Sequence, residues 1–192
     1  MRLFVRLWLC VACLVLSSAS LLAFDPASEA NIERRDGLLN SRIKFERTGK
    51  GHVAFIGGSI TEMDGYRPMV SADLKKRFPK TEFTFTDAGI SSTCSTNGAY
   101  RLSSDVLAKG PVDLFFIEFA VNDDQDAAHA RRECVRGMEG ILRHCLQHNP
   151  QMDIVVTYFV NEGMLAKLQK KEVPISIGAH GDVCHHYGVS TI

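Results

Sequence analysis

The stretch that decides the fold is His52-Val53-Ala54-Phe55-Ile56-Gly57-Gly58-Ser59-Ile60-Thr61. A short apolar run leads into two glycines and a serine, and a helical pattern follows a few residues later. An apolar run of this length that ends in Gly-Gly predicts a buried strand followed by a tight turn. The serine therefore stands where a strand gives way to a helix.

The same pattern recurs along the chain. Further strands are predicted at residues 82–86, 113–120, 153–160 and 190–192, and helices at 67–78, 99–107, 127–148, 164–171 and 177–186. Strands that alternate with helices predict a parallel sheet with helices on both faces. The nearly continuous apolar character of residues 114–119 and 154–160 fits strands that are buried on both faces. The fold class is therefore α/β.

Function in such sheets gathers at the carboxyl ends of the strands. Three residues stand there: Ser59 after the first strand, Gly89 after the second and Asn122 after the third. Ser59 suits a nucleophile whose own N–H helps to hold an oxyanion, with Gly89 N–H and the Asn122 carboxamide as further donors. Taken singly, each has a simpler interpretation: a helix cap or phosphate-binding turn for Ser59, and ordinary turn residues for Gly89 and Asn122.

Together, three segments resemble the first three sequence blocks of the SGNH (GDSL-like) hydrolase family. They are Phe55-Ile56-Gly57-Gly58-Ser59-Ile60-Thr61, Asp87-Ala88-Gly89-Ile90 and Glu118-Phe119-Ala120-Val121-Asn122-Asp123. The resemblance implies a three-layer α/β/α sandwich of flavodoxin-like type with about five strands. It implies Ser59 as nucleophile and Ser59, Gly89 and Asn122 as the oxyanion hole. It also implies hydrolysis of carboxylic esters, often acetyl groups on sugars.

The family's general base is a histidine in an Asp-x-x-His motif after the fifth strand, and the sequence ends within that strand. Asp182 to His185 matches the motif literally but precedes the strand, so we expect His185 to lie away from the crevice. His180 and His186 are expected on the solvent face of the same helix, and His129 at a surface helix position. We therefore expect an incomplete chain with little esterase activity, because a serine without a base is a poor nucleophile.

Residues 1–23 have the pattern of a secretory signal peptide: Arg2 and Arg6, an apolar run over 7–16, and small residues after it. An uncleaved membrane anchor is the alternative. Residues 24–50 are predicted to form a linker and an amphipathic helix, and residues 51–192 the hydrolase domain. The protein is thus expected to be exported to the periplasm, the cell surface or the medium.

Charge and composition exclude some other functions. Lys plus Arg and Asp plus Glu both total 22, so the net charge is zero and nothing suggests a nucleic-acid partner, which would need a basic face. No cofactor is implied, and the histidines and cysteines show no metal-ligand spacing. The cysteines after residue 23 are expected to be mostly free and buried; they are Cys94, Cys134, Cys145 and Cys184. Two functional alternatives stay open: a ligand-binding module without turnover, and a flavodoxin-like nucleotide or flavin binder.

Overall fold

The structure, a computed structural model, describes residues 31–192, so the predicted signal peptide lies outside the described part. Its centre is a five-stranded, all-parallel sheet in the order β2-β1-β3-β4-β5. The strands are β1 (Lys50–Gly57), β2 (Glu82–Gly89), β3 (Leu114–Glu118), β4 (Asp153–Val156) and β5 (Ser190–Thr191). The predicted α/β sandwich with about five strands is confirmed.

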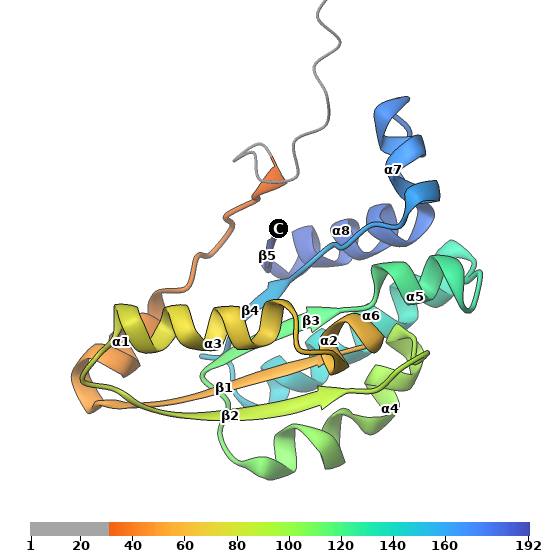
Figure 1. Cartoon of the computed structure of the whole chain (residues 1–192). Helices are drawn as coiled ribbons and strands as arrows, with labels where there is room; N and C mark the ends of the chain where they lie inside the picture. Colours follow the sequence, from red (N-terminus) through yellow and green to blue (C-terminus); the bar gives the residue numbers. More distant parts are fainter. Residues whose placement is uncertain (1–30) are drawn as a thin grey trace, which may run out of the picture.

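Helices cover both faces of this sheet, as Figure 1 shows for α3 and α4 on opposite sides of β1 and β2. They are α1 (Leu39–Thr48), α2 (Ser59–Glu62), α3 (Tyr66–Arg77), α4 (Ser95–Asp105), α5 (Ala120–Gln125), α6 (Arg131–His148), α7 (Glu162–Gln169) and α8 (Ile175–Tyr187). The predicted helix over 127–148 is thus shorter, and a separate short helix, α5, follows β3.

Successive side chains of each strand enter different hydrophobic cores, because neighbouring residues in a strand point to opposite faces. On β1, Val53 and Phe55 pack with Phe45 of α1 and with α3. Ala54 and Ile56 pack instead with residues of α4, α6 and α8. This two-sided burial explains why residues 53–56, 114–117 and 154–156 are apolar without interruption.

The segment before residue 51 is joined to the sheet. Phe45 is 2% exposed, and Ser41 donates through both its backbone N–H and its hydroxyl to Asp153 Oδ2, each at 2.7 Å. Glu33 pairs antiparallel with Thr191 of β5. The described part of residues 24–50 therefore packs as part of the same domain. Among the helices of residues 31–192, none combines the length and apolar character that crossing a membrane requires.

Candidate active site

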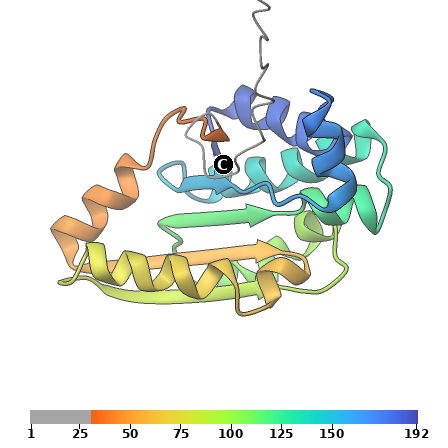
Figure 2. The ribbon, with the colours of Figure 1, turned by 45° about the horizontal axis from the view of Figure 1, so that its top comes forward.

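The three predicted loops leave the sheet at one rim. In the register of the sheet Gly57, the last residue of β1, lies opposite both Gly89 of β2 and Glu118 of β3. The three strands point the same way and end side by side (Figure 2). The segments that carry Ser59, Gly89 and Asn122 are therefore neighbours at the carboxyl rim.

Ser59 is the first residue of α2, directly after the turn residue Gly58. It is partly exposed, and within residues 31–192 its hydroxyl makes no hydrogen bond. The far end of α2 is held by Arg67, whose Nε donates to the Thr61 carbonyl at 3.0 Å and whose guanidinium also forms an ion pair with Asp87 at 2.9 Å. The accessible Ser59 hydroxyl therefore lies on a turn whose far end is held in place by Arg67.

The Asn122 carboxamide packs directly against the turn before Ser59. A Cβ atom added to Gly58 would lie 2.1 Å from Asn122 Oδ1, so only glycine permits this approach. Asn122 is 3% exposed, and its Nδ2 donates to Asp126 Oδ2 at 2.7 Å. The carboxamide is therefore fixed beside the backbone that presents the serine.

Glycine is also required at position 89, because β2 and α2 approach each other closely there. A Cβ atom there would lie 2.3 Å from the backbone nitrogen of Glu62 in α2, so any side chain would push β2 and α2 apart. Its own N–H donates to Asp87 Oδ1 at 3.0 Å. That Gly89 N–H faces the crevice as an oxyanion donor stays a prediction.

Next to Asn122, Asp123 is the centre of a buried network. Its carboxylate accepts the Ser95 N–H at 2.8 Å, the Ser95 hydroxyl at 2.6 Å and the His180 Nε2 at 2.9 Å. Burial works against ionisation, but the hydrogen bonds from His180 and Ser95 and the charge of His180 hold the Asp123 pKa below its usual value. Asp123 thus ties α4, α5 and α8 together.

The expectation for His180 is wrong. Its side chain is 0% exposed instead of facing solvent, because α8 turns this residue toward α5. His129 precedes α6 instead of lying on a surface helix, and its Nδ1 lies 3.4 Å from Asp123 Oδ1. The partly apolar pattern of α8 did not indicate that His180 is buried. The sequence around a histidine does not show whether a carboxylate from another element lies beside it.

Cys134 completes a set of potential metal ligands, because its sulfur and the nearest ligand atoms of Asp123 and His180 all lie within 4.8 Å of one another. The Asp123 carboxylate is already occupied by hydrogen bonds from Ser95 and His180. Burial and the nearby Asp123 also raise the pKa of the Cys134 thiol to about 12, which keeps it protonated. These contacts describe a hydrogen-bonded network, and we assign no metal to it.

Glu118, at the end of β3, is a second buried carboxyl at the rim. It is 0% exposed, its Oε2 lies 3.5 Å from the Thr61 hydroxyl, and its Oε1 has no hydrogen-bond partner. Burial raises its pKa to about 7, against the opposing effects of the Thr61 hydroxyl and the Gly58 N–H. A carboxyl of this kind changes its charge near neutral pH.

No histidine hydrogen-bonds Ser59, and all seven lie in the described part of the chain. His185 and His186 are exposed near the carboxyl end of α8. The structure therefore brings Ser59, Gly89 and Asn122 to one rim without a histidine that could take the serine proton directly.

Two arginines that support the site were missed from the sequence. Arg67 is described above; Arg101 of α4 donates to the carbonyls of Gly57 at 3.0 Å and Ala88 at 2.6 Å. Arg101 thus joins the ends of β1 and β2. Nothing in the local sequence distinguishes these arginines from surface residues, because their acceptors are backbone carbonyls of distant segments.

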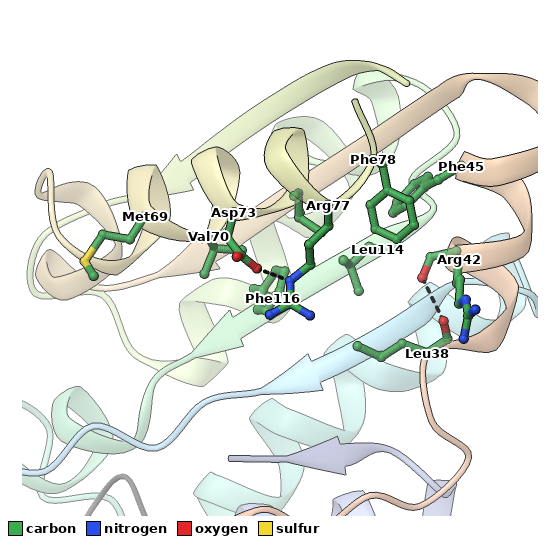
Figure 3. A pocket seen from close by; sticks show the side chains of 12 residues that line it. Leu38, Arg42, Phe45, Met69, Val70, Asp73, Arg77, Phe78, Leu114 and Phe116 are labelled. Carbon is green, nitrogen blue, oxygen red and sulfur yellow. Dashed lines mark hydrogen bonds and ion pairs between the residues drawn. The ribbon is translucent and has the colours of Figure 1, made fainter. Parts of the chain in front are cut away.

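The four cysteines after residue 23 are free and buried, as predicted. A largely apolar hollow of about 560 Å³ lies away from Ser59, on the face of the sheet that carries α1 and α3. Figure 3 shows Phe78 and Val70 of the α3 region above Leu114 and Phe116 of β3. This hollow is separate from the polar rim.

Comparison with solved structures connects this geometry to known enzymes. A two-domain esterase (CEX) active on acetylated mannans, crystallised with mannopentaose, matches with a TM-score of 0.67 and 29% identity. The match covers 85% of this chain and 43% of that one, so the chain spans less than half the length of that esterase.

Other matches share less sequence identity. TesA matches with a TM-score of 0.61 and 16% identity over 73% of this chain and 76% of its own. A variant of Axe2, an acetylxylan esterase from Geobacillus stearothermophilus, matches with a TM-score of 0.55 and 19% identity over 74% and 75%. The chain has the SGNH-hydrolase fold. No protein-family model and no curated protein matches the chain.

Proposed function

We propose that this SGNH-type chain is a serine ester hydrolase that removes acyl groups, acetyl above all, from carbohydrates. The observation that carries the proposal is the packing of the Asn122 carboxamide against Gly58, beside a serine with a free hydroxyl. The CEX and Axe2 esterases support the substrate class, since they act on acetylated mannans and acetylxylan. Such a substrate agrees with the proposal that the protein is exported.

In this proposal Ser59 attacks the ester carbonyl, and the Ser59 N–H, the Gly89 N–H and Asn122 Nδ2 stabilise the oxyanion. Two of these donors already bond to carboxylates, Gly89 to Asp87 and Asn122 to Asp126. These carboxylates hold the donors in place before substrate binds. Asn122 Nδ2 has a second hydrogen that can bond to the oxyanion. The single Gly89 N–H must either donate to Asp87 and the oxyanion together or leave Asp87.

We place the general base outside the seven histidines of this chain. His180 is engaged with Asp123, and His185 lies toward the far end of α8. A positioned base contributes about 10²- to 10⁴-fold to such reactions. We therefore expect Ser59-dependent hydrolysis by this chain to be slower than that of CEX by about that factor.

The test measures hydrolysis of p-nitrophenyl acetate and of acetylated mannooligosaccharides, together with fluorophosphonate labelling, for the wild type, Ser59→Ala and Ser104→Ala. Ser104 is an exposed serine on α4 and serves as the matched control. We expect slow hydrolysis and labelling that disappear in Ser59→Ala and persist in Ser104→Ala. Equal rates in wild type and Ser59→Ala would overturn the proposal.

Binding without turnover is the opposing outcome. It would show as calorimetric binding of acetylated mannooligosaccharides with no Ser59-dependent release of acetate at any pH. Hydrolysis as fast as that of CEX would contradict the missing base while leaving Ser59 as nucleophile.

A further inference from the structure

The turn that presents Ser59 lies on Glu118, a residue that the proposed reaction does not use. Gly57 pairs with Glu118 in the sheet, so the last residue of β3 is level with the start of the turn. A Cβ atom on Gly57 would lie 2.6 Å from the Glu118 carbonyl oxygen and 2.1 Å from Thr61 Oγ1. The turn is therefore packed onto the Glu118 backbone and the Thr61 side chain.

The Glu118 carboxyl contacts the turn through Thr61, two residues after the serine. The Gly58 N–H precedes Ser59, the Thr61 hydroxyl follows it, and both favour the ionised carboxylate. The contact with Thr61 is long, at 3.5 Å. Thr61 is itself 0% exposed and contacts Tyr66 Oη at 3.1 Å.

We propose that Glu118 is a positioning residue for Ser59: its carboxylate accepts from the Thr61 hydroxyl while its backbone packs against Gly57, and it so fixes the turn that presents the nucleophile. The role in catalysis depends on the function proposed above, whereas the contact with the turn does not. Glu118 touches neither substrate nor reacting atoms in this arrangement.

The groups that face Glu118 explain why its charge is finely balanced. Thr61 and the Gly58 N–H come from the turn and α2, Tyr66 from α3 and Asp123 from α5. The two donors favour the anion, while burial and the Asp123 charge oppose it. Protonation of Glu118 replaces a charged acceptor with a neutral one, so its hold on the turn weakens as the pH falls.

The direct test follows the backbone amides of Gly58 and Ser59 by NMR in ¹⁵N-labelled full chain between pH 5 and pH 9. We expect both amide resonances to shift with a midpoint near 7, as Glu118 does. In Glu118→Gln this titration should vanish, and in Glu172→Gln, an exposed control, it should persist. Amides that do not titrate in the wild type, or that titrate unchanged in Glu118→Gln, would overturn the proposal.

The kinetic test compares Glu118→Ala with Glu118→Gln. Removal of the acceptor should lower kcat about 10- to 100-fold with little change in KM, because the turn is misplaced while the substrate surface stays. Glutamine keeps one acceptor oxygen and should restore kcat to within about threefold of the wild type while removing the ionisation near pH 7. Equal kcat in Glu118→Ala and wild type would contradict the positioning role.

The two tests separate the two proposals. Wild-type protein without Ser59-dependent hydrolysis but with the amide titration would refute the esterase and retain the Glu118 contact. Ser59-dependent hydrolysis without the titration would retain the esterase and refute the role of Glu118.

Discussion

Two buried carboxyl groups stand at the same rim of the sheet and behave in opposite ways. Asp123 accepts bonds from Ser95 and His180, and its pKa lies below the usual value. Glu118 is equally buried, has one oxygen without a partner, and has a pKa raised to about 7. Burial is common to both, so the hydrogen-bond donors and the neighbouring charges together decide the sign of each pKa shift.

The comparison separates a permanent structural network, around Asp123, from a contact that changes with pH, at Glu118. Asp123 joins three helices behind Asn122 and keeps its charge over a wide pH range. Glu118 lies beneath the Ser59 turn and changes charge near neutrality. One rim thus combines a rigid element with an element that responds to pH.

The largest effect is expected from Asp123→Ala. Removal of the carboxylate leaves His180 and Ser95 buried without their acceptor, which costs about 3–5 kcal/mol of unfolding free energy. Urea unfolding at pH 7 measures this loss. Asp124→Ala, whose ion pair with Lys167 is 3.7 Å long, is the matched control and should cost about 1 kcal/mol or less. Equal losses for the two variants would show that the Asp123 network does not stabilise the fold more than a surface ion pair does.

The next effect is the pH dependence of stability in Glu118→Gln. The Glu118 pKa rises from about 4.5 in the unfolded chain to about 7 in the fold, so the native state binds this proton more tightly. Wild-type stability should therefore fall as the pH rises from 4.5 through 7, by up to about 3 kcal/mol. Chemical unfolding across pH 4.5–8.5 should show this decline in the wild type and its loss in the variant.

Asp123 should show the opposite sign, which sharpens the comparison. Its lowered pKa contributes stability that is present above the unfolded value and lost as the pH falls through the folded value. A wild-type protein whose stability is flat between pH 4.5 and 7, as in Glu118→Gln, would mean that Glu118 is not titrating as described.

Much of this rim follows from the sequence. The apolar run at residues 52–56 and the glycines after it place a strand and a turn, because both local pattern and tertiary burial favour them. The rule that parallel strands end at one edge then brings Ser59, Gly89 and Asn122 together. These residues were predictable because each directly follows a strand. The alternation of strands and helices along the sequence predicts that those strands are parallel.

The supporting contacts were not predictable from the same pattern. His180, Arg101 and Arg67 meet partners far away in the chain, and their local sequence resembles an ordinary helix surface. The opposite charges of Glu118 and Asp123 also depend on donors from other elements. The periodicity of a single sequence indicates which face of a helix or strand is buried. It does not indicate which polar group of another element lies against that face.

A smaller effect is expected from Gly58→Ala. The added methyl group would collide with the Asn122 carboxamide, which is held by Asp126, so stability should fall by about 1–3 kcal/mol. Any Ser59-dependent labelling should fall as well, because Asn122 is displaced. Gly65→Ala is the control: no atom lies within 4 Å of its added Cβ. Thermal unfolding and fluorophosphonate labelling of both variants measure the difference, and equal behaviour would refute the tight Gly58–Asn122 contact.

The smallest effect is expected from Tyr66→Phe, which probes Glu118 through an intermediate residue. The Tyr66 hydroxyl lies 3.1 Å from Thr61 Oγ1, and either oxygen can donate in this contact. Because Thr61 has one hydroxyl hydrogen and donates it to Glu118, we expect Tyr66 to donate to Thr61 and to polarise its hydroxyl. Removal of the Tyr66 hydroxyl should cost about 1 kcal/mol and move the Glu118 midpoint to higher pH, because the Thr61 bond to the carboxylate weakens. Unfolding across pH measures both quantities, and Tyr100→Phe, on an exposed ring, should change neither. A Glu118 midpoint that does not move in Tyr66→Phe would mean that the Tyr66 hydroxyl does not strengthen the bond from Thr61 to the Glu118 carboxylate.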